Sequence, residues 1–137
     1  MLTYALAFVP VPDARDRTLR PAPMNALPPV MERRSASGTT FVLAVDPALP
    51  GFQGHFPGDP VLPGVIQVDW AARFGAIAFG ELGRFLGVAQ LKFSGIIRPG
   101  ETVELSLEHQ AGAGKLAFVY RAGTQRKSSG VLLFSER

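Results

Sequence analysis

The amino-acid sequence predicts an α+β domain in which a mostly antiparallel sheet packs one face against a single long helix. Two patterns carry this prediction. Residues 102–110 alternate between apolar and polar side chains, with Val103, Leu105 and Leu107 on one face, which is typical of a half-buried strand. Residues 65–80 are apolar almost all round, which predicts a buried helix of about 24 Å.

Two strands and a long loop precede the predicted helix. The strands are expected at residues 29–35 and 39–45, and Phe41, Leu43 and Val45 share one face of the second strand. Residues 46–64 are rich in proline and glycine, so the path of their backbone is largely predetermined. Pro63 suits the first position of the helix, where its missing N–H costs no hydrogen bond.

Further strands are expected after the helix, separated by turn-forming residues. Glycines in residues 80–87 end the helix, and turns are predicted at Arg98-Pro99-Gly100 and at residues 111–114. The predicted strands lie at residues 88–93, 102–110, 116–123 and 128–134.

One domain accounts for most of the chain. With 137 residues the chain is long enough for one hydrophobic core, which we expect at residues 29–137. Residues 1–28 are rich in proline and mixed in charge, so we expect an N-terminal extension that is flexible or loosely packed. A true start at Met24 would also explain this composition.

The sequence predicts a cytoplasmic protein without a membrane span. Residues 1–9 are apolar but lack the basic beginning of a signal peptide, and prolines interrupt them early. No apolar run approaches the roughly 20 residues that cross a bilayer.

Composition excludes several kinds of site. The chain has no cysteine, which excludes disulfides, thiolate metal ligands and thiol nucleophiles. Its two histidines, His55 and His109, have no metal-binding spacing. The sequence contains no serine-hydrolase elbow, nucleotide-binding loop or nucleic-acid-binding motif. We therefore expect no metal, no cofactor and no nucleic acid.

The C-terminal part of the chain is basic. Residues 112–137 contain one acidic residue, Glu136, and five basic residues, which are Lys115, Arg121, Arg126, Lys127 and Arg137. Such a surface would attract an acidic partner and speed encounter with it. A solvated edge with a few unpaired arginines explains the same residues.

The candidate site lies where the proline- and glycine-rich loop meets the helix. His55 in this loop has an unperturbed pKa of about 6.5, so it can take and return a proton at neutral pH. The nearby helix N-terminus favours developing negative charge. A histidine that only donates to backbone carbonyls is the structural alternative.

Asp69 is a carboxylate in the second turn of an apolar helix. Among Val68, Trp70 and similar neighbours it costs free energy unless it is paired or protonated. A carboxyl with a raised pKa can share a proton with a substrate hydroxyl. The alternative is an ion pair with Arg73, which lies four residues on.

Residues 54–65, Gly-His-Phe-Pro-Gly-Asp-Pro-Val-Leu-Pro-Gly-Val, resemble the signature of the 3-hydroxyacyl-acyl-carrier-protein dehydratases of the hot-dog fold. A weaker similarity to the same family extends from Leu91-Lys92-Phe93 through residues 97–101, the strand and turn that follow the helix. In element order the resemblance covers residues 29–134. It implies a curved antiparallel sheet wrapped around one long central helix, and a homodimer whose two sheets join edge to edge.

The resemblance also implies roles for individual residues. His55 of one subunit faces Asp69 of the other, so each site is shared between subunits. His55 removes the proton from C2 of a 3-hydroxyacyl thioester, and Asp69 holds the 3-hydroxyl as water leaves. The backbone N–H of Gly64, between Pro63 and Val65, binds the thioester carbonyl. An acidic acyl carrier protein is the implied transient partner, in fatty acid or polyene-type biosynthesis.

Several side chains near the helix could line a pocket for the acyl chain, although core packing explains the same residues. They are Phe52, Phe56, Leu62, Trp70, Phe74, Phe79 and Phe93.

The sequence departs from the common form of the family. Asp69 replaces the usual glutamate, and aspartate here resembles both the dehydratase/isomerase branch and a shorter branch associated with aryl-polyene pigments. Gln67-Val68-Asp69-Trp70 resembles the second branch more. Leu62 stands where methionine is frequent. Arg73 stands where glutamine is usual, and a nearby cation lowers the pKa of a carboxyl.

Two other functions fit the same fold. A hot-dog thioesterase would use a carboxylate to activate water, and the His-Phe-Pro-Gly loop argues against it. A non-catalytic acyl-binding subunit of a biosynthetic complex would fit if Arg73 held Asp69 away from substrate.

Overall fold

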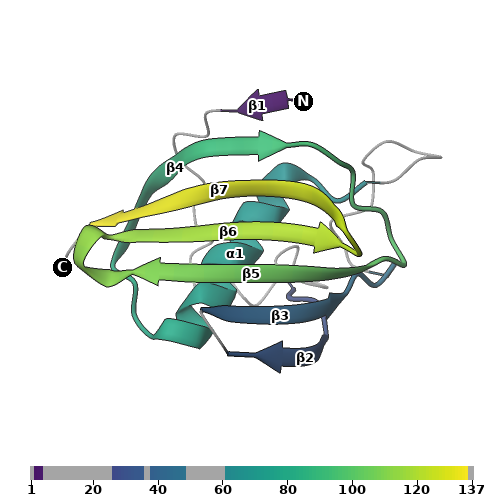
Figure 1. Cartoon of the computed structure of the whole chain (residues 1–137), viewed down its shortest axis with the longest axis horizontal. Coiled ribbons are helices and arrows are strands. Elements are labelled where there is room, and N and C mark those ends of the chain that lie inside the picture. Colours follow the sequence, from purple (N-terminus) through teal and green to yellow (C-terminus); the bar gives the residue numbers. More distant parts are fainter. Residues whose placement is uncertain (1, 5–25, 36–37, 49–60, 136–137) are drawn as a thin grey trace, which may run out of the picture.

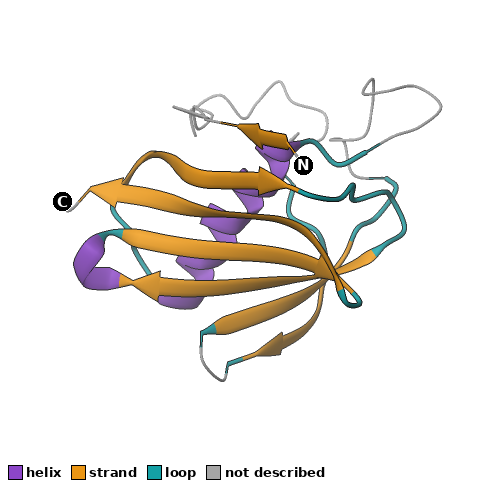
Figure 2. Ribbon diagram, turned by 45° about the horizontal axis from the view of Figure 1, so that its top comes forward, coloured by secondary structure: helices purple, strands orange, loops and turns teal. Residues whose placement is uncertain are grey.

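In the part of the chain that the structure describes, a curved sheet packs against a long helix. The computed structural model describes residues 2–4, 26–35, 38–48 and 61–135. Its strands form a seven-stranded sheet in the order β1-β4-β7-β6-β5-β3-β2, in which all neighbours are antiparallel. The helix α1 lies across one face of the sheet (Figure 1; Figure 2). This arrangement confirms the predicted α+β, hot-dog fold.

Every predicted strand and the predicted helix are present, and all but β5 have shifted ends. The described elements are β1 (Leu2–Tyr4), β2 (Val30–Arg34), β3 (Thr39–Ala44), α1 (Gly64–Phe79), β4 (Arg84–Phe93), β5 (Thr102–Gln110), the short 3₁₀ helix η2 (Ala111–Ala113), β6 (Lys115–Ala122) and β7 (Gln125–Ser135). β4 begins earlier than predicted because the strand continues through Gly87, where its pairing with β7 is irregular. β7 begins earlier because the β6–β7 hairpin turns tightly at Gly123, whose φ is 61°.

β1 is a strand that the sequence did not predict. Three residues are too few to show an alternating pattern, yet Leu2 pairs opposite Phe93 and Tyr4 opposite Leu91 of β4. At the other end of the predicted extension, Ala26 and Leu27 pack against the core. The expected flexibility concerns residues 5–25, which lie outside the described residues.

The core lies between α1 and the face of the sheet that curves around it. Val103, Leu105 and Leu107 are buried, which confirms the alternation predicted for β5. Gly75 lets the helix approach β6 closely, because a methyl group there would collide with the side chain of Leu116. The described helices include none that is long and apolar enough to cross a membrane.

The prediction that α1 is buried all round is wrong for the single chain. Val65 is 43% exposed and Ile77 is 54% exposed, both on α1. One sheet covers only one side of a helix, so the apolar residues on its other side stay open to solvent.

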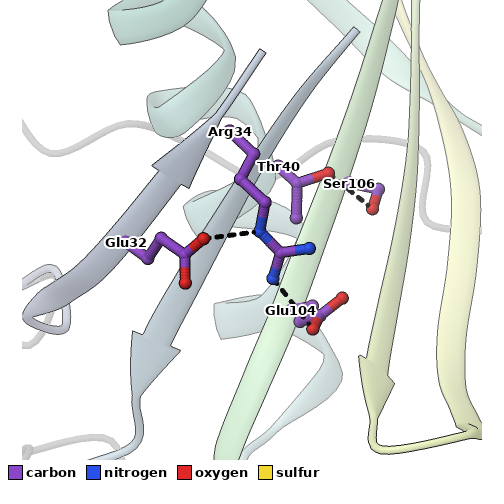
Figure 3. Close-up of polar contacts among 5 residues, drawn as sticks. All are labelled: Glu32, Arg34, Thr40, Glu104 and Ser106. Carbon is purple, nitrogen blue, oxygen red and sulfur yellow. Dashed lines mark hydrogen bonds and ion pairs between the residues drawn. The ribbon is translucent and has the colours of Figure 1, made fainter. Parts of the chain in front are cut away.

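The outer face of the sheet is polar across β2, β3 and β5 (Figure 3). Nη2 of Arg34 donates to Oε2 of Glu104 at 3.1 Å, and Nε of Arg34 lies 2.9 Å from Oε2 of Glu32. The hydroxyls of Thr40 and Ser106 are 3.1 Å apart. These contacts give the face of the sheet away from α1 a polar surface over these strands.

Candidate active site

The helix α1 begins directly after the proline- and glycine-rich loop. Pro63 has an extended ψ of 147°, which places it at the cap, one residue before its predicted helical position. Its carbonyl accepts the N–H groups of Ile66 and Gln67, each at 3.1 Å. No described carbonyl accepts the N–H of Gly64 or of Val65, as is normal in a first helical turn. These two N–H groups can bind an oxygen that gains negative charge.

Gly64 lies against the ring of Phe93, at the end of β4. A methyl group at Gly64 would collide with this ring. The N–H of Leu62 also donates to the carbonyl of Ile97, in the loop after β4, at 2.8 Å. The start of α1 is thus held against the end of β4, and the absence of a side chain at Gly64 makes this close approach possible.

Asp69 lies in the second turn of the same helix, and its side chain is 26% exposed. Burial raises the pKa of this carboxyl, and the neighbouring Arg73 offsets only part of that rise. Nη1 of Arg73 lies 3.4 Å from Oδ2 of Asp69. The sequence suggested either an ion pair with Arg73 or a carboxyl with a raised pKa. The two are compatible, because the ion pair forms and the pKa of Asp69 is still raised.

We predict that Arg73→Gln raises the pKa of Asp69 further. The substitution removes the cation that opposes the effect of burial, so the carboxyl keeps its proton to a higher pH. Any activity that needs protonated Asp69 should then extend to higher pH. The pH dependence of kcat/KM and a carboxyl NMR titration measure this shift. Lys115→Gln, an exposed change at the start of β6, is the control, and an Asp69 titration that stays the same or moves to lower pH would contradict the prediction.

The remaining predicted site residues are distributed between the helix start and the core. His55, Phe52 and Phe56 lie outside the described residues. Pro63, Gly64, Val65 and Phe93 meet at the helix start.

The predicted acyl-pocket residues on the helix side mostly pack in the core. Leu62 and Trp70 are buried there. The ring of Phe74 lies 4.7 Å from that of Phe41, centre to centre, and Phe79 packs on the ring of His109. Of the described candidates, Phe93 is the aromatic residue in contact with the start of α1.

A buried polar cluster beneath the helix start was missed by the sequence reasoning. Gln67 is only 3% exposed, and its Nε2 donates to the carbonyl of Leu62 at 3.0 Å. Oγ of Ser128 donates to Oε1 of Gln67 at 2.7 Å. Oη of Tyr120 donates to the backbone carbonyl of Gln67 at 2.6 Å. The cluster ties α1 to β6 and β7.

The signal for this cluster was present in the strand pattern. Tyr120 has the same parity along β6 as Leu116 and Phe118, and Ser128 has the parity of Leu132 along β7. Both side chains therefore point inward, where a polar group needs a hydrogen-bond partner. Burial raises the pKa of Tyr120 well above its usual value, and the charge of Asp69 raises it further, so the phenol remains a donor.

The predicted basic surface needs a correction at Lys127. Its side chain is only 10% exposed. Its Nζ donates to the carbonyl of Ile96 at 2.8 Å and lies 3.5 Å from Oε2 of Glu101. The residue is buried because the loop after β4 covers it. Lys115 lies at the opposite end of β6 from Arg121, and Arg137 is outside the described residues.

Comparisons with known proteins point to one family. A family model described as ApeI-like, the ApeI dehydratase, matches residues 31–131. The structure of the dehydratase heterocomplex ApeI:P from Xenorhabdus doucetiae is similar, with a TM-score of 0.73 and 30% identity over 79% of this chain and 97% of that one. The 3-hydroxyacyl-[acyl-carrier-protein] dehydratase FabZ of Caldicellulosiruptor saccharolyticus is 39% identical over 77% of this chain and 81% of its own.

Other relatives match over shorter segments. FabZ of Oenococcus oeni is 46% identical over 63 residues, which are 41% of this chain and 45% of that protein. FabZ of Latilactobacillus sakei is 42% identical over 76 residues, 47% of this chain and 54% of that protein. The chain thus spans about half the length of these two curated relatives.

Proposed function

We propose that this chain, which belongs to the ApeI-like dehydratase family, removes water from 3-hydroxyacyl thioesters of acyl carrier protein to give trans-2-enoyl thioesters. One observation carries the proposal. A carboxyl with a raised pKa, Asp69, lies one turn beyond helix-start N–H groups that have no acceptor among the described residues. Several relatives are named for this reaction. We also propose that the enzyme acts in the cytoplasm.

The reaction needs a base at C2 and an acid at the 3-hydroxyl. In the proposed mechanism His55 takes the C2 proton, and the N–H of Gly64 binds the thioester oxygen, where negative charge develops. Asp69 then gives its proton to the leaving hydroxyl. The C2–H and C3–O bonds break, the C2=C3 bond forms, and water leaves. The role of His55 follows from the signature in residues 54–65.

We infer a homodimer that pairs through β4. Among the described residues β1 covers only Leu91–Phe93 of this edge, so residues 84–90 have no strand on that side. An unpaired edge is a template for another chain, and Leu86 is exposed on it. In the proposed dimer His55 of one subunit serves Asp69 of the other.

The function is tested by a screen of enoyl and 3-hydroxyacyl carrier-protein thioesters of different chain lengths, including conjugated polyenes. We expect reversible hydration and dehydration at neutral pH. Release of a free acid would support a thioesterase instead. No reaction with any thioester would contradict the dehydratase, provided that the chain is tested as the oligomer that it forms.

The acyl carrier protein is proposed to dock beside the start of α1. Arg121 and Arg126 are opposite each other at the β6–β7 hairpin, and Arg126 is exposed. The hydroxyl of Ser94 donates to the carbonyl of Arg126 at 3.0 Å, which joins this hairpin to the loop after β4. Ile97 of that loop binds Leu62 before the helix. Positive charge and helix start therefore lie at the same end of the molecule (Figure 1).

We predict that Arg121→Glu combined with Arg126→Glu raises KM for a carrier-protein thioester several-fold and leaves kcat unchanged. The two changes replace attraction by repulsion of an acidic partner. KM for the same acyl group on pantetheine should stay constant, and the effect should shrink at high salt. Lys115→Glu, at the other end of β6, is the matched control. An equal rise of KM for both substrates would contradict a docking role.

A further inference from the structure

We propose that Gln67 is a positioning residue, which fixes the carbonyl-binding end of α1 and Asp69 relative to the sheet through bonds from Tyr120 and Ser128. The inference rests on the proposed function and concerns how its site is held. Gln67 itself is buried, so its role is to orient groups that touch substrate rather than to touch substrate.

The side chain of Gln67 is held at both ends of its amide. Nε2 donates backward to the carbonyl of Leu62 at 3.0 Å, which pins the residue before the helix cap. Oε1 accepts from the hydroxyl of Ser128 at 2.7 Å, on β7. Leu62 is bound from its other side by the carbonyl of Ile97. The segment that leads into Gly64 is therefore fixed by two directional contacts.

The backbone of Gln67 is held as well. The hydroxyl of Tyr120 on β6 donates to the carbonyl of Gln67 at 2.6 Å, and the tyrosine is fully buried. β6 and β7 are interior strands of the sheet, each hydrogen-bonded on both sides. The helix is thus attached to strands in the interior of the sheet, where local opening costs the most free energy.

Apolar packing alone would fix the position and rotation of α1 less precisely than these hydrogen bonds do. Contacts such as Phe74 against Phe41 are non-directional, so small slides or rotations of a helix change them little. Hydrogen bonds weaken steeply with angle. Gln67 is three residues after Gly64 and two before Asp69, so a rotation of α1 at this point moves both groups that face the substrate.

The experiment removes one hydroxyl at a time, in Ser128→Ala and in Tyr120→Phe. The matched control is Ser106→Ala, which removes a hydroxyl of a pair 3.1 Å apart on the outer face of the sheet. Each folded variant is assayed with a short enoyl thioester for kcat, KM and their pH dependence, and the amide NMR signals of Gly64 and Val65 are recorded.

We expect both variants to lose roughly tenfold or more in kcat with little change in KM. The amide signals of Gly64 and Val65 and the pH profile should also shift. Ser106→Ala should leave all of these unchanged. Variants with the parent kcat and unshifted amide signals would overturn the inference. If the parent chain itself is inactive, the proposed function fails, and the amide signals of the variants still decide whether Gln67 sets the helix start.

Discussion

Asp69→Asn is expected to lower kcat for hydration and dehydration by roughly 10²- to 10⁴-fold, the range typical of a lost general acid. Asparagine has nearly the same shape but has no proton to give to the leaving hydroxyl. Steady-state kinetics with an enoyl carrier-protein thioester measures the loss. KM should change little, because the binding groups at the start of α1 remain. A variant as active as the parent would contradict the role of Asp69.

At neutral pH, the Asp69→Asn variant should be at least as stable against unfolding as the parent chain. Burial raises the pKa of Asp69 in the folded chain above its unfolded value. Its contribution to stability is therefore complete below the unfolded pKa and is lost as pH rises through the raised folded pKa. Asparagine does not ionise, so the variant does not lose this stability as pH rises. Thermal unfolding at acid and at neutral pH tests the sign.

This pair of measurements separates catalysis from structure. If Asp69 served the fold through its contact with Arg73, Asp69→Asn would lower activity and stability together. The contact is long, at 3.4 Å, and Arg73 is partly exposed, so we expect its contribution to stability to be small.

Periodicity predicted the parts of the fold in which one face meets the core. β5 alternates because Val103, Leu105 and Leu107 pack under the helix while Glu104 and Ser106 face out, and its predicted bounds are those observed. The length and apolar character of α1 were sufficient to locate it. The sequence signature then added what periodicity does not contain, namely the wrapping of the sheet around the helix.

Features that depend on long-range contacts were not predictable in the same way. Lys127 appeared as part of a basic surface, yet it is buried because a carbonyl from the loop after β4 receives its ammonium group. β1 is recognised as a strand through its pairing with β4. In both cases the partner is distant in sequence, so no local pattern indicates the contact.

The candidate site is intermediate between these cases. Asp69 was identified from the chain itself, because a carboxylate departs from what a buried helix needs, whereas the role of Gly64 came from the resemblance to the family. The support beneath them was missed, since Gln67 acquires its meaning only when Tyr120 and Ser128 are known to reach it. Asp69, which we propose acts in the site, stood out locally, whereas the residues beneath it did not.

The second large effect concerns the sharing of sites between subunits. We predict that His55→Ala and Asp69→Asn are each nearly inactive as homodimers, and that a heterodimer of the two regains about half of the parent activity. In such a heterodimer one site receives His55 from the Asp69→Asn chain and Asp69 from the His55→Ala chain, so it is intact. Co-expression with two affinity tags isolates this heterodimer for steady-state kinetics.

A chain that carries both substitutions, paired with a parent chain, supplies the opposite test. If the sites are shared, each site in that heterodimer lacks one of the two groups, and the heterodimer should be inactive. If each chain holds a complete site, the parent chain should keep about half of the activity, and the first heterodimer should regain none. Failure to isolate any heterodimer would contradict the proposed pairing through β4.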